Sequence, residues 1–242
     1  MNIPLVSAIM PTRGRPEMAR AAVKSWLLQD WRNSELVVMD DPEDPSFPLG
    51  SFQFLDADPH LYWPNITYLS VARITVGEKR NLACAVANGS IIIHFDSDDY
   101  SAPGRISHQV NGIIEWPGAR APRMARVVGY NALTFHELRA VRVLGDDGFR
   151  PPASEWWHWR EKDGLAAGTS LCYWRDWWRH HPFTADNLAE DDLFYAEALR
   201  LGVAAANDGA HLLRATNHAG CVSGRLIGGA EWEELPGDPW RQ

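Results

Sequence analysis

The chain has 242 residues, of which 45% are hydrophobic and 22% charged, and its formal net charge is −8. This composition is typical of a folded globular protein, and the acidic balance argues against a nucleic-acid or anionic-membrane surface. No segment reaches the roughly 18 apolar residues of a membrane span, and the N-terminal apolar stretch is too short for a signal peptide. Cys84, Cys172 and Cys221 are widely spaced and indicate reduced thiols, so we expect a soluble, cytoplasmic protein without stable membrane insertion.

The first elements along the chain are a strand, a helix and a second strand. Residues 4–11, PLVSAIMP, are an apolar run that ends at Pro11. Pro16 stands near the start of a predicted helix, in which apolar residues recur at helical spacing at Met18, Ala22, Trp26 and Leu28. Residues 34–41, SELVVMDD, predict a short strand that ends in acids, and residues 42–64 predict an irregular loop.

A third strand and a second helix follow. Residues 66–71, ITYLSV, form the next apolar run. Residues 77–89, GEKRNLACAVANG, predict a helix with Leu82 and Val86 on one face and Gly89 as its stop signal. The order strand, helix, strand therefore continues through the first third of the chain.

The fourth strand is residues 90–95, SIIIHF, and a further helix starts at Pro103. Because each of these strands is apolar throughout, we expect an α/β fold with a mainly parallel central sheet and helices on both faces. Residues 124–144 instead predict strands with polar alternation, and residues 154–180 are dense in tryptophan, most of which we expect in the core.

The last predicted helix is residues 190–202, EDDLFYAEALRLG. Phe194, Ala198 and Leu201 lie on one face, Gly202 closes the helix, and Asn187 is a candidate N-cap. We expect residues 1–242 to form a single domain, in which a Rossmann-like nucleotide-binding half (residues 1–100) continues into an acceptor-binding half (residues 101–242).

Polar residues follow three of the predicted strands at their carboxyl ends. These are Thr12 and Arg13, then Asp40 and Asp41, and then the stretch Asp96–Asp99. In open α/β sheets ligands bind in the crevice beyond those ends, so we expect all three groups to surround one cleft.

Asp96, Asp98 and Asp99 are candidate metal ligands. Carboxylate oxygens suit Mg²⁺ and Mn²⁺, and Mg²⁺ is usually held by one or two carboxylates together with substrate phosphates. A solvated acidic turn is the alternative, with Asp99 or Ser101 as the N-cap of the following helix.

Basic residues stand near the same predicted cleft. Lys79, Arg80 and Asn81 lie early in a helix, where the N-terminus favours anions, although a solvated helix face is the plainer interpretation of this trio. Together with Arg13 and Arg15 they offer enough positive charge to offset a diphosphate.

Glu190, Asp191 and Asp192 open the last helix. Acids in a first helical turn complement the helix dipole, which is a sufficient structural reason for them. One of them is also a candidate general base. Near the C-terminus, His211 and His218 are undecided, and His218 is the better candidate for a metal ligand.

Three segments, taken in this order, resemble the signatures of family 2 glycosyltransferases with the GT-A fold. They are VSAIMPTRGRPEMARAAVKSWLLQDWRNSELVVMDD, GEKRNLACAVANGSIIIHFDSDD and AEDDLFYAEALRLG. The resemblance covers about Pro4 to Gly202. It implies an inverting, metal-dependent enzyme that moves a sugar from a nucleotide-sugar donor, with a UDP-sugar weakly favoured, to an acceptor that the motifs do not identify.

The resemblance also implies roles for individual residues. Asp96 and Asp98 match the DxD motif that binds Mn²⁺ or Mg²⁺ and the donor diphosphate, and His218 is a possible third ligand. Asp191 matches the catalytic base. The match places the nucleotide of the donor against Pro11, Thr12, Arg13, Asp40 or Asp41, Lys79, Arg80 and Asp96.

Two alternatives belong to other classes. A nucleotidyltransferase would use a similar sheet and metal, but MPTRGRP does not match the glycine-rich loop G-x-G-T-R of those enzymes. A non-catalytic nucleotide- or carbohydrate-binding protein would not need both the DxD acids and the EDD acids.

Overall fold

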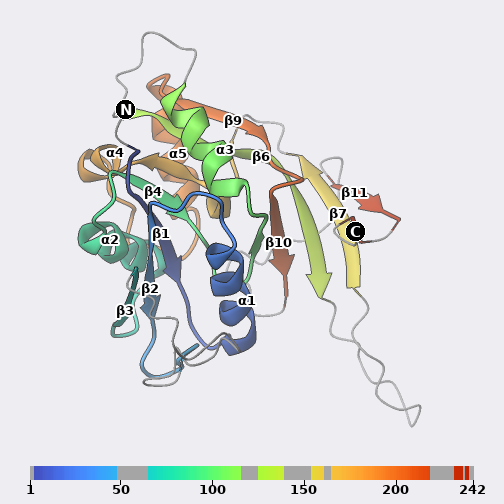
Figure 1. Cartoon of the computed structure of the whole chain (residues 1–242), viewed down its shortest axis with the longest axis horizontal. Coiled ribbons are helices and arrows are strands. Elements are labelled where there is room, and N and C mark those ends of the chain that lie inside the picture. Colours follow the sequence, from blue (N-terminus) through green and yellow to red (C-terminus); the bar gives the residue numbers. More distant parts are fainter. Residues whose placement is uncertain are drawn as a thin grey trace.

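The computed structural model describes residues 3–47, 65–115, 125–138, 154–160, 165–218, 232–236 and 238–239. Among these residues, eleven strands form one sheet, whose main path runs β11-β7-β6-β8-β4-β1-β2-β3 (Figure 1). The strands of this path are β1 (Val6–Pro11), β2 (Ser34–Asp40), β3 (Ile66–Ser70), β4 (Ile91–His94), β6 (Val127–Leu138), β7 (Ser154–Arg160), β8 (Cys172–Trp174) and β11 (Trp232–Leu235). Off the path lie β5 (Tyr100–Ser101), β9 (Ala204–Asp208) and β10 (Leu213–Asn217).

The sheet has a parallel half and a mixed half. β1 pairs in parallel with both β2 and β4, and β2 pairs in parallel with β3. β8 then joins the halves by pairing antiparallel with β4 and with β6. Since parallel strands direct their carboxyl ends to one edge, the polar residues after β1, β2 and β4 meet there, as the sequence predicts.

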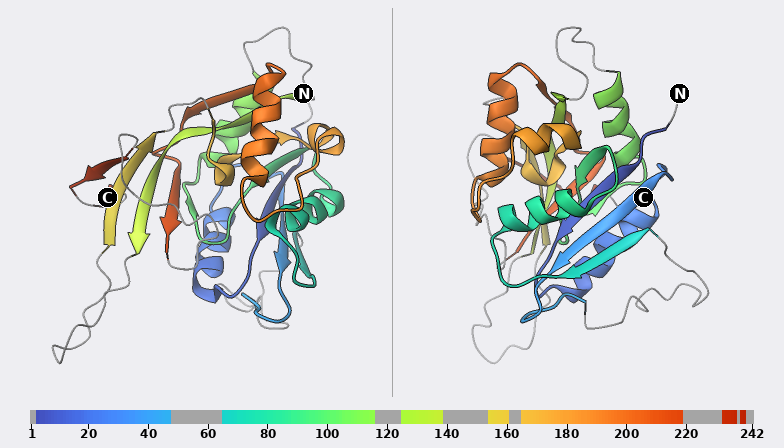
Figure 2. Two further views of the ribbon diagram at one scale, coloured as in Figure 1. Left: turned by 180° about the vertical axis from the view of Figure 1, so that it is seen from behind. Right: turned by 90° about the vertical axis from the view of Figure 1, so that its left-hand side faces the viewer.

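Helices cover both faces of the parallel half, as expected. The helices are α1 (Pro16–Leu27), α2 (Val76–Val86), α3 (Arg105–Ile114), α4 (Arg175–His180) and α5 (Glu190–Arg200), with a short 3-10 turn, η3 (Gly168–Ser170). The right-hand view of Figure 2 shows α1 and α3 on one side of the sheet and α2, α4 and α5 on the other.

The three isoleucines of β4 divide between these two layers. Ile91 and Ile93 pack with Trp26 of α1 and Val110 of α3, whereas Ile92 packs into the opposite core. Successive strand residues point to opposite faces, so a strand that is buried on both faces needs an uninterrupted apolar run. β4 therefore holds the acids that follow it on a rigid support.

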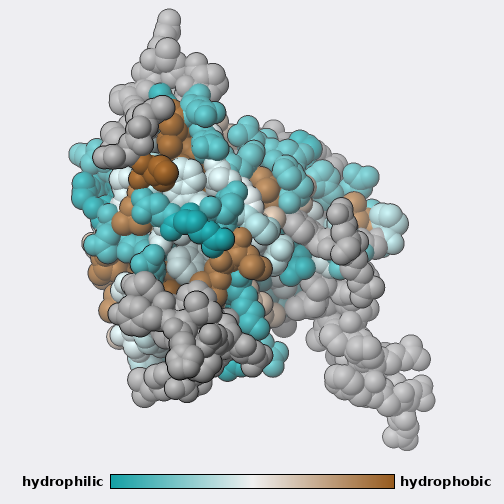
Figure 3. Space-filling view, in the orientation of Figure 1, coloured by the Kyte–Doolittle hydropathy of each residue, from teal (hydrophilic) through white to brown (hydrophobic). Residues whose placement is uncertain are grey.

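The buried faces of three helices differ from the prediction. Leu82 and Val86 of α2 are each 42% exposed, and Leu28 and Leu201 are also exposed. The packed face of α2 instead carries the small residues Ala83 and Cys84, which allow the helix to lie close to the sheet. Exposed hydrophobic residues form small separate groups in the view of Figure 3.

Two predicted helix ends also need correction. Asn187 is not an N-cap of α5, because Ala189 occupies that position and the Asn187 Oδ1 accepts a hydrogen bond of 3.0 Å from Val76 N at the start of α2. Gly89 does not stop α2, which ends at Val86. A Cβ at Gly89 would lie 2.5 Å from Ser7 Oγ, so glycine is required there by close packing. Gly202, at φ +69, does close α5.

Other expectations concern side chains distant from the sheet edge. Trp156, Trp159, Trp174 and Trp177 are buried, as predicted for core residues. Cys84 and Cys172 are free and buried, and Cys221 and residues 48–64 lie outside the described residues. Within the described ranges, no helix combines the length and the apolar character that a membrane crossing needs.

Candidate active site

A cavity of about 550 Å³ lies at the carboxyl ends of β1, β2 and β4. The second half of the chain closes it with η3, the start of α5 and two residues of β10. All residues expected to hold the donor, the metal or the proton line this cavity, except Asp40 and His218. The lining residues are Pro11, Thr12, Arg13, Arg15, Asp41, Ile74, Val76, Lys79, Arg80, Asp96, Asp98, Asp99, Ala167, Gly168, Thr169, Asn187, Leu188, Ala189, Glu190, Asp191, Asp192, Ala215 and Thr216.

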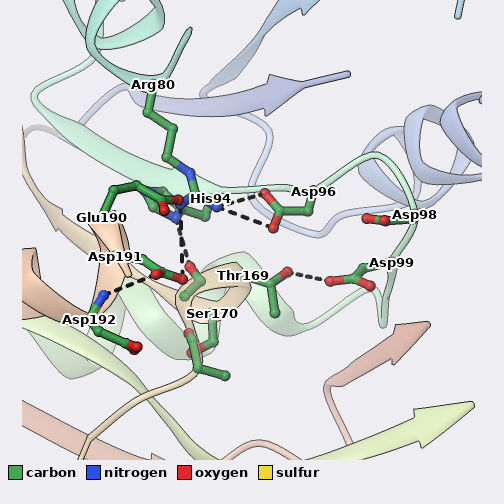
Figure 4. A network of polar contacts seen from close by, with 12 residues as sticks. Arg80, His94, Asp96, Asp98, Asp99, Thr169, Ser170, Glu190, Asp191 and Asp192 are labelled. Carbon is green, nitrogen blue, oxygen red and sulfur yellow. Dashed lines mark hydrogen bonds and ion pairs between the residues drawn. The ribbon is translucent and has the colours of Figure 1, made fainter. Parts of the chain in front are cut away.

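Arg80 links the acids of the two halves (Figure 4). Its Nη2 lies 3.3 Å from Asp96 Oδ2, while its Nη1 forms an ion pair with Glu190 and lies 4.0 Å from Asp191 Oδ2. Arg80 is only 3% exposed, so the solvated-face interpretation of this helix is wrong. Burial alone would lower the pKa of Arg80, but the surrounding carboxylates raise it, so the guanidinium remains charged.

The start of α2 explains how Lys79 and Arg80 reach the cavity. Thr75 and Glu78 form a capping box, in which Glu78 N donates to Thr75 Oγ1 and Glu78 Oε2 accepts from Thr75 N. This fixes the first turn of the helix. The Lys79 Nζ donates a hydrogen bond of 2.8 Å to the carbonyl oxygen of Thr12, and burial lowers the pKa of Lys79.

Asp98 has two basic neighbours on one oxygen. Arg15 Nη1 lies 2.5 Å and His218 Nε2 3.1 Å from Asp98 Oδ2. Burial alone would raise the pKa of Asp98, but the His218 hydrogen bond and the Arg15 charge lower it. The structure therefore brings His218 to the DxD motif, as expected of a candidate third ligand, although His218 itself borders a neighbouring cavity of about 480 Å³.

Asp99 also lines the cavity, but it is bound within the protein. It accepts hydrogen bonds from the Thr169 hydroxyl and from Thr216 N, so both of its oxygens are used within the protein. The predicted role of Asp99 or Ser101 as a helix N-cap is wrong, because Gly104 precedes α3 without a side-chain cap. Burial, with repulsion from Asp98 and Asp96, raises the pKa of Asp99 well above its ordinary value.

Asp96 and Asp98 fit a divalent cation only if a bound phosphate group supplies further coordinating oxygens. Among the described residues, no group of three or more His, Cys, Asp or Glu side chains could hold a metal ion by itself. Asp96 and Asp98 do present carboxylates to the cavity, and burial and the neighbouring acids raise the pKa of Asp96. Two carboxylates that need further charge compensation suit Mg²⁺ or Mn²⁺ whose coordination is completed by phosphate oxygens and water.

The acids after β2 have separate positions. Asp41 lines the cavity. Asp40 is fully buried behind it, where its carboxylate accepts hydrogen bonds from the backbone N–H groups of Asp41, Ser46 and Phe47 and from the Tyr68 hydroxyl. Asp40 therefore shapes the loop that follows β2, and Asp41 is the acid that the cavity presents.

Asp191 lies in the first turn of α5, where the helix dipole stabilises a negative charge. Ala189, just before the helix, has φ +61, a left-handed conformation that costs a non-glycine residue about 1–2 kcal/mol. On its other side Asp191 meets Gly168 of η3, where a Cβ would lie 1.4 Å from Asp191 Oδ2. The carboxylate thus occupies space that only glycine leaves open.

Two residues of the site, Gly168 and Thr169, are absent from the sequence prediction, and the ion-pair role of a third, Glu190, is not predicted. Gly168 makes room for Asp191, Thr169 binds Asp99, and Glu190 forms the ion pair with Arg80. The EDD motif could have indicated Glu190, since a buried acid next to the expected base needs a cation. Gly168 and Thr169 stand between predicted elements, and nothing in their local sequence marks them.

The chain matches the sequence profile described as Glycosyl transferase family 2 over residues 7–160, which is more than half of its length. It therefore belongs to the family 2 glycosyltransferases, which confirms the family and the class of enzyme that the motifs suggest. It is 38% identical over 108 residues to WcaA of Escherichia coli (strain K12), which is named as a colanic acid biosynthesis glycosyl transferase. It is 28% identical over 116 residues to an uncharacterized glycosyltransferase of Haemophilus influenzae. These matches cover 44% and 48% of this chain and only 37% and 44% of the two relatives.

Solved structures with the same fold confirm the expected fold class, a GT-A type α/β domain with a mostly parallel central sheet. TarS residues 1–349 from S. aureus, in complex with UDP, superposes with a TM-score of 0.59 at 19% identity, covering 87% of this chain and 60% of TarS 1–349. The mannosyltransferase PcManGT from Pyrobaculum calidifontis, in complex with GDP-Man and Mn²⁺, gives 0.61 at 16% identity, covering 91% and 59%.

Proposed function

We propose that this chain transfers a sugar from a nucleoside diphosphate sugar to an acceptor hydroxyl, with inversion at the anomeric carbon. The observation that carries the proposal is the convergence of Asp96, Asp98 and Asp191 on one cavity, where Arg80 links Asp96 to Asp191. This displacement needs two groups: a pair of acids that holds a metal ion and the diphosphate, and a separate acid that accepts a proton.

The donor nucleotide is assigned to the part of the cavity built by residues 1–100. Pro11, Thr12, Arg13 and Asp41 line it there, and Lys79 spans from α2 to the Thr12 carbonyl. Asp40 contributes by holding the loop that follows it. Relatives of this fold are seen with UDP, UDP-GlcNAc and GDP-Man, and a UDP-sugar is the weakly favoured donor for this chain.

Asp96 and Asp98 would hold Mn²⁺ or Mg²⁺, with His218 adjacent to Asp98 as a possible further ligand. When bound, the cation would supply electrostatic stabilisation to the diphosphate as negative charge develops on it. Arg80 and Arg15 add positive charge from the protein itself, because Arg80 contacts Asp96 and Arg15 contacts Asp98.

Asp191 acts as the general base in this proposal. It takes the proton of the acceptor hydroxyl while the hydroxyl oxygen bonds to the anomeric carbon, and the bond from that carbon to the diphosphate oxygen breaks on the opposite face. One displacement of this kind inverts the anomeric configuration. The acceptor itself is assigned to residues 101–242 of the same domain, which supply η3, α5 and β10 to the cavity wall.

A panel of nucleotide sugars tests the proposal. Thermal unfolding of the full chain is measured with UDP-GlcNAc, UDP-glucose, UDP-galactose and GDP-mannose, each with and without Mn²⁺, because a ligand that binds the folded state raises the unfolding midpoint. We expect one donor to stabilise the chain in a Mn²⁺-dependent way and to release nucleoside diphosphate on incubation. Release of the sugar 1-phosphate instead would indicate transfer of the nucleotidyl group and contradict the proposal.

A further inference from the structure

The strongest unassigned feature of the molecule is the contact between η3 and the first turn of α5. The three heavy atoms nearest to a Cβ built on Gly168 all belong to Asp191: Oδ2 at 1.4 Å, Cγ at 2.3 Å and Cβ at 2.7 Å. Real Cβ atoms do not approach other heavy atoms within 3.0 Å. Any side chain at this position would therefore have to displace either Asp191 or the turn that carries Gly168.

The turn is held firmly on its sheet side. The Gly168 carbonyl oxygen accepts a hydrogen bond of 2.7 Å from His94 Nδ1, and the Thr169 carbonyl oxygen accepts one of 2.8 Å from Arg105 Nη2. Both His94 and Arg105 are fully buried. His94 is held in turn by the Tyr173 hydroxyl, which lies 3.2 Å from its Nε2. Movement of the turn would break several buried hydrogen bonds, each costly to leave unmade.

Asp191 has much less to hold it. Its side chain is 21% exposed, and its Oδ2 lies 4.0 Å from Arg80 Nη1. Its Oδ1 accepts a hydrogen bond of 3.0 Å from Asp192 N, the next residue along the helix. A side chain at Gly168 would therefore move Asp191 and leave the turn in place. Figure 4 shows Asp191 and the turn side by side, with Thr169 reaching from the same turn to Asp99.

Thr169 connects this turn to the loop of Asp96, Asp98 and Asp99. Its hydroxyl donates to Asp99 Oδ2, and the other Asp99 oxygen accepts a hydrogen bond of 2.9 Å from Thr216 N in β10. β10 leads directly to His218, which contacts Asp98. One turn of the chain thus contacts the expected base with one residue and the acid motif with the next.

We propose that Gly168 and Thr169 are positioning residues: Gly168 sets where the Asp191 carboxylate lies, and Thr169 sets the acid motif relative to it. This rests on the proposed function, in which Asp191 is the base and Asp96 and Asp98 bind the donor diphosphate. The two residues act through the acids they contact, so their effect is on the rate of the displacement more than on the affinity for the nucleotide.

The first test is structural and needs no activity. Crystal structures of the wild-type chain and of Gly168→Ala are compared. The Asp191 carboxylate is expected to move by more than about 1 Å in the variant, whereas the hydrogen bonds of the turn to His94 and Arg105 stay in place. An unmoved Asp191 with a shifted turn would overturn the inference, whatever the reaction proves to be.

The second test is kinetic and uses hydrolysis of UDP-GlcNAc, in which water takes the place of the acceptor, or of GDP-mannose if the panel selects that donor. Gly168→Ala is expected to lower kcat by about 100-fold, because a displacement of about 1 Å costs that much, with KM changed less than about twofold. Gly112→Ala, on α3 with no atom within 4 Å of its added Cβ, is the matched control and keeps kcat and KM. A kcat of Gly168→Ala within about twofold of the control, while Asp191→Asn is inactive, would overturn the inference.

Thr169 supplies an independent pair of variants in case Gly168→Ala does not fold. Thr169→Val removes the hydroxyl at nearly constant volume and is expected to lower kcat about tenfold, since Asp99 loses a buried partner. Thr169→Ser keeps the hydroxyl and restores the rate. Equal rates for the two variants would contradict the role of Thr169. If Asp191→Asn is fully active while the Asp191 carboxylate still moves in Gly168→Ala, the proposed function fails and the packing inference stands.

Discussion

At the scale of single residues, Asp96 and Asp98 each have a basic partner within the protein. Asp96 forms an ion pair with Arg80, and Asp98 Oδ2 is contacted by both Arg15 and His218. A cation that binds Asp98 must therefore compete with a guanidinium for Asp98 Oδ2. These basic partners stabilise the buried carboxylates in the absence of a donor, and they lower the affinity of the site for a metal ion alone.

Replacing Arg15 with Gln should expose this competition. Without nucleotide, Mn²⁺ is expected to bind Arg15→Gln roughly fivefold more tightly than the wild-type chain, which corresponds to about 1 kcal/mol for a partly buried ion pair. The measurement is titration of free Mn²⁺ by electron paramagnetic resonance. Lys24→Gln, an exposed residue of α1, is the matched control for the lost charge. Unchanged or weaker binding by Arg15→Gln would show that the pair does not oppose the metal.

The sequence alone was enough to predict which acids line the cavity, but it did not predict the residues that contact them. Asp96, Asp98 and Asp191 follow recognisable motifs, and strand ends in a parallel sheet bring such motifs together. The pairing of Arg80 with Glu190 joins residues 110 positions apart, and the fit of Gly168 to Asp191 depends on the exact approach of two loops. Neither contact has a local signal, because each is created by the packing of distant elements.

At the scale of elements, the buried acid Glu35 connects several segments of the parallel half of the sheet by hydrogen bonds. Glu35 in β2 accepts hydrogen bonds from Ser7 of β1, at 2.5 Å, and from the backbone and side chain of Asn88, at 2.6 and 2.9 Å. Gly89 N also donates to it. Glu35 thus joins two strands to the connection between α2 and β4, and so fixes the base of the strand that carries the DxD motif.

Glu35→Gln should lower the free energy of unfolding by about 1–3 kcal/mol at pH 7, since it weakens charge-assisted hydrogen bonds in a buried site. Burial alone would raise the pKa of Glu35, but these hydrogen bonds lower it below the ordinary 4.5. A carboxyl group whose pKa is lower in the folded state than in the unfolded state stabilises the fold at pH values above its unfolded-state pKa. This stabilisation is lost as the pH falls through the folded-state pKa. The difference between wild type and variant should therefore shrink below pH 4.5 in urea unfolding. A constant difference between pH 7 and pH 3 would contradict this assignment.

Element order was predictable, but the buried face of each helix was less so. Apolar runs and turn residues mark β1, β2, β3 and β4 clearly, because strands buried on both faces have few polar residues. In α2 the apolar Leu82 and Val86 face outwards, since the helix presents small residues to the sheet and Lys79 and Arg80 to the cavity. Functional demands on one helix face thus override the simple hydrophobic pattern.

At the scale of the whole molecule, a chain with a net charge of −8 is proposed to bind a polyanionic donor. Four basic residues, Arg13, Arg15, Lys79 and Arg80, line the cavity, but seven acids line it as well, so the protein alone does not supply a net positive charge there. A divalent cation adds positive charge only if the diphosphate helps to hold it, as the two-carboxylate site suggests. Metal and nucleotide should then each strengthen the binding of the other.

This coupling is measurable by isothermal titration calorimetry with UDP and Mn²⁺. We expect Mn²⁺ to tighten UDP binding by about tenfold or more, and UDP to tighten Mn²⁺ binding by the same factor, because coupling between two ligands is reciprocal. EDTA should reverse the gain. Mg²⁺ should act in the same direction. UDP affinity that is equal with Mn²⁺ and with EDTA would remove the metal from the proposed site.

The most direct test of the central claim is the turnover of a donor by Asp191→Asn beside Asp192→Asn. Both variants remove one acid from the first turn of α5, and both positions border the cavity. If Asp191 is the base, Asp191→Asn loses about 10²- to 10⁴-fold in kcat with UDP affinity retained, and Asp192→Asn loses far less. Full activity in Asp191→Asn, or an equal loss in both variants, would contradict the assignment of Asp191 as the group that accepts the proton.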